Sequence, residues 1–123
     1  VSGAGDVNGD GYSDLIVGAS GYNASQGRAY IFLGSATGIV ATGAAQRDIL
    51  LEGTATSQNF ALGAPAWGDL NGDGYADALI GAEGYNASNG GVFIYYGSST
   101  GIANLSAPHS IISGTGGTFA RRV

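Results

Sequence analysis

An oxygen-rich segment of nine residues occurs twice in this chain, with the pattern Asp-x-Asn-Gly-Asp-Gly-Tyr-x-Asp. Oxygen donors recur at every second position, and glycine at the sixth position permits the sharp turn that lets them converge. All-oxygen protein cages suit Ca²⁺ better than the smaller, more tightly hydrated Mg²⁺, so we expect one calcium ion in each loop and two per chain. The predicted ligands, with the tyrosines contributing their main-chain carbonyls, are Asp6, Asn8, Asp10, Tyr12, Asp14, Asp69, Asn71, Asp73, Tyr75 and Asp77.

These loops differ from an EF-hand in their second half. An EF-hand requires a bidentate glutamate at position 12, where this chain has Val17 and Ile80. Three carboxylates crowded in one loop repel each other without a cation, so we expect the loops to be strained or disordered when metal is absent. A turn rich in Asp, Asn and Gly that binds nothing is the alternative, and the twofold occurrence of the whole pattern disfavours it. The inferred role of the metal is structural, because it would fix the turn between two strands.

The two loops belong to a longer internal repeat. Between residues 6–39 and 69–102, which are offset by 63 positions, 21 of the 34 residues are identical. Recurrence with a period of about 60 residues indicates repeated supersecondary units rather than one irregular domain.

The repeat unit is predicted to consist of β-strands, because short runs rich in Val, Ile, Tyr and Phe alternate with clusters of Gly, Asn, Ser and Asp. No stretch shows sustained helical periodicity. The expected strands are 15–19, 28–33, 47–51, 60–67, 78–82, 91–96 and 109–113, with a partial strand at 119–123. About four strands per repeat suit the four-stranded antiparallel blade of a β-propeller. A β-sandwich is the alternative, but a sandwich has no reason to repeat its own sequence so closely.

The second copy resembles one FG-GAP repeat, the blade of the integrin α-subunit propeller and its bacterial relatives. The resemblance rests on Phe60-Ala61-Leu62-Gly63, then Gly68 through Asp77, then Leu79-Ile80-Gly81-Ala82. It implies that the metal loop joins the first and second strands of a blade, that the metal is Ca²⁺, and that the protein is of an adhesion-like class. The chain departs from the family pattern only around the inner strand, at Phe60-Ala61, Ala64-Pro65, Phe119-Ala120 and Arg121-Arg122.

The repeat pattern divides the chain, a single propeller segment over 1–123, into two blades in circularly permuted form. Residues 1–59 form the first blade and residues 60–118 the second. Residues 119–123 match the start of an inner strand, and we expect them to complete the blade that begins at residue 1.

Two blades cannot close a ring, and an open pair would expose apolar faces and unpaired strand edges. We therefore expect a head-to-tail homo-oligomer of three or four chains, closed by strand exchange. The alternative is a segment of a longer natural propeller. Because the chain starts at Val1 rather than Met, we expect a processed, excised or engineered segment.

Charge and composition exclude several kinds of partner. The formal charge is −5, but six of the nine acidic residues lie inside the two loops, so the acidity is local. The chain has no lysine, and its arginines form no basic stripe, which argues against nucleic acid. No apolar run approaches the length of a membrane span, so no membrane insertion is expected. A cysteine-free scaffold that depends on Ca²⁺ suits an extracellular or cell-surface setting for the natural parent.

The function predicted from these patterns is a non-catalytic, calcium-stabilised propeller that scaffolds protein or glycan binding. Its blades are so similar that a minimal or engineered self-assembling propeller fits equally well. A lectin-like module with one sugar site per blade is an alternative, built on Tyr22/Tyr85 and Asn23/Asn86. An enzyme is the other alternative, in which general acid–base work would fall to Asp48, Glu52, Glu83 or the tyrosines. No pairing of these acids is visible in the sequence.

Overall fold

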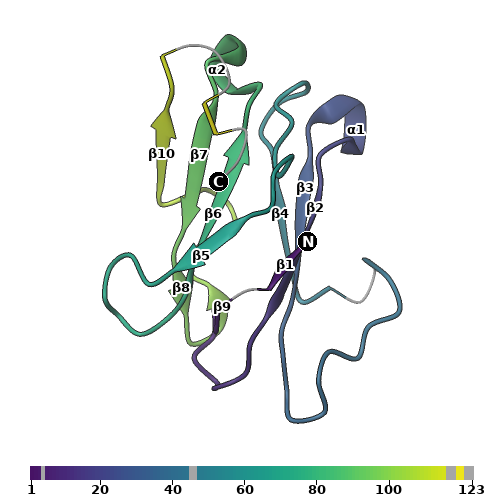
Figure 1. Ribbon diagram of the computed structural model, residues 1–123, viewed down its shortest axis with the longest axis vertical. Coiled ribbons are helices and arrows are strands. Elements are labelled where there is room, and N and C mark those ends of the chain that lie inside the picture. The colour runs from purple at the N-terminus through teal and green to yellow at the C-terminus, as the bar shows by residue number, and fades with distance from the viewer. Residues whose placement is uncertain (4, 45–46, 116–118, 121–123) are drawn as a thin grey trace.

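A computed structural model describes residues 1–3, 5–44, 47–115 and 119–120 of this chain. Within them the chain forms two four-stranded antiparallel sheets and a small two-stranded sheet, with two very short helical turns (Figure 1). The elements in chain order are β1 (Ser2–Gly3), β2 (Leu15–Ala19), α1 (Tyr22–Ser25), β3 (Arg28–Phe32), β4 (Ile49–Glu52), β5 (Ala66–Gly68), β6 (Asp77–Ala82), α2 (Tyr85–Ser88), β7 (Gly91–Tyr95), β8 (Gly97–Ser98), β9 (Gly101–Ile102) and β10 (Ser110–Ser113).

The two large sheets repeat the same topology. Their strand orders are β1-β2-β3-β4 and β5-β6-β7-β10, with every neighbouring pair antiparallel. Ile16 faces Ile31 across the first sheet, and the repeat-equivalent Leu79 faces Ile94 across the second. The predicted all-β architecture of four-stranded antiparallel sheets is therefore confirmed, whereas closure of a ring stays a prediction.

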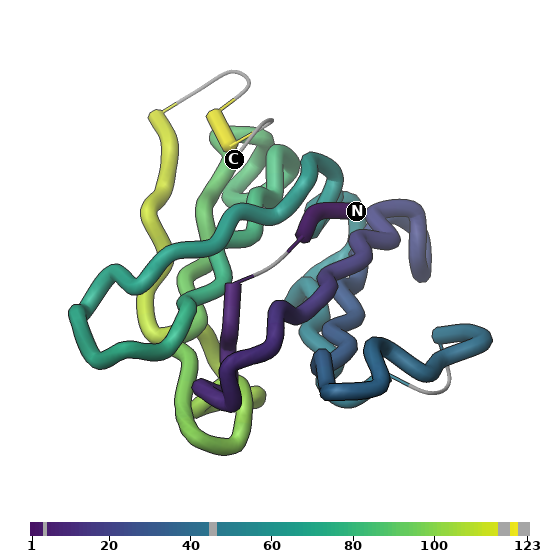
Figure 2. Tube along the Cα trace, turned by 60° about the horizontal axis from the view of Figure 1, so that its bottom comes forward, coloured from purple at the N-terminus to yellow at the C-terminus, as the bar shows by residue number. Residues whose placement is uncertain are grey.

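The first strands of both sheets lie next to each other at the centre of the molecule. Figures 1 and 2 show β1 close to the segment that leads into β5, and the Ser2 hydroxyl donates a hydrogen bond of 2.7 Å to the carbonyl oxygen of Pro65. The remaining strands extend away from this contact in the two halves of the molecule. Inner strands that converge in this way are what a propeller requires around its axis.

One apolar core joins the two sheets. Strand residues alternate between faces, so each sheet sends every second side chain into this core. The first sheet contributes Ile16, Ala29, Ile31, Ile49 and Leu51, and the second contributes Ala78, Ile80, Ala82, Phe93 and Tyr95. We call this set, together with the buried Phe60, the inter-sheet core. The contact between the sheets is thus a hydrophobic interior and not a surface association.

The link between the sheets is held at Phe60. Its ring packs edge-on against Phe93, with ring centroids 5.3 Å apart, and its backbone N–H donates to the Gln26 carbonyl at 3.3 Å. The next residue, Ala61, donates its N–H to the Gly81 carbonyl in the second sheet at 2.8 Å. A side chain at Gly27, where φ is +85°, would clash with the Phe60 backbone, so glycine is required there.

The structure departs from the predicted strands at a few positions. The strand expected at 60–67 is shorter, because Ala61 has a positive φ of 62° and Phe60 makes only an isolated bridge to Ala82. The strands β1, β8 and β9 were not predicted, since two-residue strands leave no periodic pattern. Of the predicted strand 119–123, Phe119 and Ala120 form a turn and the other residues lie outside the described part of the chain.

The helical turns α1 and α2 have an unusual conformation. Asn23 and Ala24 have φ values of 47° and 54°, and the repeat-equivalent Asn86 and Ala87 have 50° and 56°. Each turn is therefore left-handed, a conformation that costs L-residues about 1–2 kcal/mol apiece.

Among the described residues, neither α1 nor α2 has the length and apolar character that crossing a membrane requires.

Tyr95 gives the fold a predicted sensitivity to alkali. Its side chain is buried in the inter-sheet core, and burial raises the pKa of its hydroxyl from 10.0 to about 12. Because the folded-state pKa lies above the unfolded one, stability is intact below pH 10 and falls as the pH rises toward 12. We expect Tyr95→Phe to lose less stability over this interval, measured by urea unfolding with tyrosinate absorbance as a second signal. Equal alkaline losses in both proteins would contradict the prediction.

Candidate metal centre

The two oxygen-rich segments occupy equivalent loops. Loop 1, residues 6–14, leads from β1 to β2, and loop 2, residues 69–77, leads from β5 into β6. Each loop therefore joins the first and second strands of its sheet, as the family resemblance implied.

The first aspartate organises each loop from within. The Asp6 carboxylate accepts backbone N–H groups from Gly9 at 2.6 Å, Asp10 at 3.0 Å and Gly11 at 2.7 Å. In loop 2, Asp69 accepts the equivalent N–H groups of Gly72, Asp73 and Gly74 at 2.7, 3.1 and 2.9 Å. Gly11 and Gly74 have φ values of 88° and 91°, which a side chain would disfavour. The sharp turn expected from the glycine spacing is present in both loops.

Side chains at the third and fifth positions meet at the exposed rim of each loop. The Asn8 amide donates to the Asp10 carboxylate at 2.9 Å, and that carboxylate accepts the Tyr12 backbone N–H at the same distance. The Asn71 amide donates to Asp73 at 2.9 Å, and Asp73 accepts the Tyr75 N–H at 3.0 Å. The structure therefore brings the predicted ligands at positions 1, 3 and 5 into one hydrogen-bonded turn.

The ninth position has a second task that the sequence did not reveal. The buried Asp14 carboxylate accepts the N–H of Val7 at 2.7 Å and that of Gly34, which follows β3, at 2.8 Å. Burial is the main cause that raises the pKa of Asp14, opposed by these two donors, and the charges of Asp10 and Asp6 raise it further. This carboxylate therefore fastens the loop to the neighbouring strand.

Asp77 repeats this arrangement in loop 2. It is fully buried and accepts the N–H groups of Leu70 at 2.7 Å and Gly97 at 3.0 Å. Each carboxylate oxygen has two lone-pair directions, so one hydrogen bond per oxygen leaves capacity for a cation. Position 9 can thus combine a structural role with ligation.

The donor set fits a hard cation. Both loops offer only carboxylate, amide and carbonyl oxygens, which suit Ca²⁺ and exclude sites that depend on thiolate or imidazole. In the described part of the chain, no group of three or more His, Cys, Asp or Glu side chains is arranged to hold a metal ion. The chemistry of the loops therefore matches calcium, while ligation by Asp6, Asn8, Asp10, Tyr12 and Asp14 and by their equivalents in loop 2 stays a prediction.

The two loops also touch each other. The Ala76 N–H donates to the Asp6 carbonyl at 2.9 Å, and the Ser98 N–H donates to the Val7 carbonyl at 3.2 Å. A Cβ at Gly9 would lie 2.6 Å from the ring of Tyr75, so glycine permits this close approach. Loop 1 is consequently seated on loop 2 and on β8 of the small sheet, and the fully buried Val7 belongs to the same core as the strands.

Asp77→Asn should destabilise the fold by about 2–3 kcal/mol, because an amide leaves one buried backbone N–H without an acceptor. The measurement is urea unfolding in chelator, so that metal binding does not contribute. Asp73→Asn is the control, since its carboxylate is at the exposed rim, and should cost less than about 1 kcal/mol. Equal losses of unfolding free energy in the two variants would show that the buried hydrogen bonds from Leu70 and Gly97 do not stabilise the fold.

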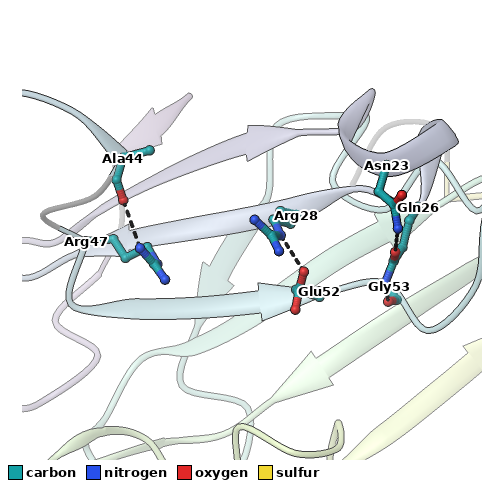
Figure 3. A network of polar contacts seen from close by, with 7 residues as sticks. All are labelled: Asn23, Gln26, Arg28, Ala44, Arg47, Glu52 and Gly53. Carbon is teal, nitrogen blue, oxygen red and sulfur yellow. Dashed lines mark hydrogen bonds and ion pairs between the residues drawn. The ribbon is translucent and has the colours of Figure 1, made fainter.

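The tyrosines of the alternative sugar-binding hypothesis, Tyr22 and Tyr85, have different surroundings in the two sheets. The Arg28 guanidinium covers the Tyr22 ring at 3.4 Å from its centroid, whereas Tyr85 packs edge-on against Phe93 with centroids 5.2 Å apart. Figure 3 shows Arg28 paired with Glu52, and the Asn23 amide directed at Gln26 in the turn. These residues make contacts within the fold, and the two copies do not form one repeated binding surface.

The carboxylates considered for acid–base work also make structural contacts. Asp48 accepts the Leu33 N–H at 2.7 Å, Glu52 pairs with Arg28, and Glu83 accepts the Asn59 amide at 3.5 Å. Trp67, beside loop 2, packs against the inter-sheet core. Asp48 and Glu52 stand at the two ends of β4 and Glu83 follows β6, and each contacts backbone or side-chain groups of the fold.

A chain of repeated four-stranded antiparallel sheets, each with an Asp-rich loop between its first two strands, is a protein of propeller-blade type. A family model described as "FG-GAP repeat" matches residues 1–32 and 61–95, which is more than half of the chain. This chain belongs to the FG-GAP repeat family.

Individual relatives agree with this assignment. The chain is 38% identical over 117 residues to mouse phosphatidylinositol-glycan-specific phospholipase D, with 88% of the chain and 14% of the relative covered. It is 37% identical over 115 residues to mouse integrin alpha-3 (89% and 10% covered) and 38% identical over 123 residues to chicken integrin alpha-6 (93% and 10% covered). The chain thus spans a small part of the length of each of these relatives.

Proposed function

We propose that this chain supplies two adjoining blades of a calcium-stabilised, non-catalytic β-propeller that serves as a binding module of adhesion type. The observation that carries the proposal is the repeated loop, in which Asp6 and Asp69 each gather three backbone N–H groups. A loop built twice with the same acceptors and the same exposed oxygen rim points to a repeated ligand, and its donor chemistry suits Ca²⁺.

The proposed role of the metal is to stabilise the fold. A divalent cation would offset the mutual repulsion of the loop carboxylates, which adds to the larger effect of burial in raising the pKa of Asp14. The chain's own residues hold the turn, and loop 1 bears on loop 2 through the bond from Ala76 to Asp6. Calcium would therefore reinforce a seam between the two blades as well as each blade separately.

Isothermal titration of the chelator-treated protein with CaCl₂ tests the metal assignment. We expect two sites in the starting protein and one site in Asp10→Asn or Asp73→Asn, because each variant removes a carboxylate from one loop. Asp48→Asn removes a carboxylate outside the loops and should retain both sites. Heat signals that are absent in the starting protein, or unchanged in the loop variants, would overturn the assignment.

An adhesion-type role is supported by the matches to integrin alpha-3 and integrin alpha-6. The match to phospholipase D covers 14% of that protein, so it supports shared blades and not a shared reaction. The proposed ligands are protein or glycan surfaces, and the proposed setting of the natural parent is extracellular or at the cell surface. Ring closure requires further blades, which we propose are supplied by copies of this chain, three or four in all.

A further inference from the structure

The two outer faces of this blade pair carry the repeat equivalents of residues buried between the blades, and these equivalents are more exposed than their buried counterparts. Each blade has two apolar faces, and only one face of each takes part in the inter-sheet core. The offset of 63 residues makes it possible to compare each open face with its buried counterpart on the same molecule. We call them the β2–β3 face and the β7–β10 face.

The β2–β3 face consists of Leu15, Val17, Tyr30 and Phe32. Their equivalents in the second blade are, in the same order, Ala78, Ile80, Phe93 and Tyr95, all of which are buried against the first blade. On the first blade these side chains instead line an open cavity of about 300 Å³, together with Ile39, Ala41, Gly43 and Ala44. Ile39 is 38% exposed, whereas its equivalent Ile102 is 5% exposed in the core.

The β7–β10 face lies on the far side of the second blade and consists of Leu79, Val92, Ile94 and Ile112. Register identifies the equivalents, since Leu51 pairs with Ala29 and Ile112 pairs with Val92. Leu51 is 1% exposed beneath the second blade, whereas Ile112 is 53% exposed. Both halves of the blade–blade contact therefore recur as partly exposed apolar faces on the outer sides of the two blades.

The start of a further blade is already placed on the β7–β10 side. The Phe119 carbonyl oxygen lies where a side chain at Gly90 would be, just as the Phe60 carbonyl oxygen lies where a side chain at Gly27 would be, at the junction between the blades. Ala120 has a φ of 64°, which matches the 62° of Ala61. The described part of the chain beyond β10 thus repeats the conformation with which the second blade begins.

We propose that a second copy of this chain docks head to tail, with its β2–β3 face on the β7–β10 face of the first copy. The proposal rests on the proposed propeller, because it takes the inter-sheet contact as a unit that repeats around an axis. A second copy fits because each molecule carries both complementary halves of a contact that this fold already makes internally. The interface is heterologous, so copies add in one direction and can close into a ring.

Static light scattering over a range of protein concentrations, in excess CaCl₂, tests the docking. The starting protein should self-associate, and either Ile112→Lys or Ile39→Lys should weaken association by about 30-fold or more, because each introduces a charge into an apolar contact. Both positions are exposed in the single chain, so the fold should persist. Leu105→Lys is the matched control, since Leu105 is 55% exposed but lies outside both faces, and should associate like the starting protein.

Mixing the two variants distinguishes a head-to-tail contact from other arrangements. Ile112→Lys retains an intact β2–β3 face and Ile39→Lys retains an intact β7–β10 face, so an equimolar mixture should form a dimer and stop there. A monomeric starting protein, association that survives in either variant, or a mixture that stays monomeric would overturn the proposal. Calcium titration of the same variants separates the docking from the metal assignment. Intact calcium binding with no association rejects the docking and ring closure by copies of this chain, and leaves the calcium-stabilised blades.

Discussion

Replacing Phe60 by alanine should lower the free energy of unfolding by about 3–5 kcal/mol, the range for truncating a buried aromatic side chain. Phe60 is 0% exposed and its ring contacts Phe93 edge-on at the junction of the two blades. The cavity left by the change would lie against the Phe60 and Ala61 backbone, which is bonded to Gln26 on one side and Gly81 on the other. Backbone bonded to both blades leaves little freedom to collapse into the cavity, so the loss should reach the upper part of that range.

Phe119→Ala is the internal control for this prediction. Phe119 occupies the equivalent repeat position but is 40% exposed, because none of the described residues forms a further blade against it. Its replacement should cost less than about 1 kcal/mol in urea unfolding. Both changes are best made in the Ile112→Lys background, where association cannot add to stability. Similar losses at Phe60 and Phe119 would contradict the view that the second blade is what buries this position.

The central strands were predictable because their apolar residues are continuous and belong to the repeat. The expected 15–19 and 28–33 correspond to β2 and β3 within one residue, and 78–82 and 91–96 correspond equally well to β6 and β7. Strong β propensity and burial act in the same direction in these segments. The repeat therefore predicted a four-stranded antiparallel blade in each copy, and the family resemblance predicted that each loop joins the first two strands.

The first strands of the two sheets were harder to predict because backbone contacts and not apolar patterns define them. β1 contains only Ser2 and Gly3, and its position depends on pairing with β2 and on the bond from Ser2 to Pro65. The run from Phe60 looked continuous, but the positive φ of Ala61 interrupts it before β5. Contacts of this kind join residues far apart in the chain, so a local pattern cannot reveal them.

In the candidate site, too, contacts within a few residues were predictable and contacts between distant residues were not. Spacing alone predicted the turn around Asp6 and the gathering of Asn8 and Asp10, because those contacts are made within a few residues. The second task of Asp14 was not predictable, since its partner Gly34 is 20 positions away and contributes only a backbone N–H. From the sequence, Asp14 could be identified only as a candidate metal ligand, because its hydrogen bond from Gly34 depends on the fold.

Saturating calcium should raise the free energy of unfolding by about 5 kcal/mol, taking two sites that each contribute about 2.7 kcal/mol at a free concentration of 100 times the dissociation constant. The physical reason is that the native turn around Asp6 and Asp69 presents the oxygen rim, whereas the unfolded chain presents no assembled site. Thermal or urea unfolding in chelator and in excess CaCl₂ measures the difference. The free energies of unfolding with and without calcium should be compared in the Ile112→Lys protein, so that self-association does not contribute.

The double variant Asp10→Asn/Asp73→Asn should respond little to calcium, and each single variant should retain less than half of the gain. The shortfall follows from the contact between the loops, since Ala76 in loop 2 donates to the Asp6 carbonyl and Gly9 lies against Tyr75. Loosening one loop therefore withdraws support from the other, and the two sites should be coupled. If the calcium-induced gains in unfolding free energy of the two single variants sum to the gain of the starting protein, the contact between the loops carries no coupling. An unchanged response in the double variant would place calcium elsewhere on the chain.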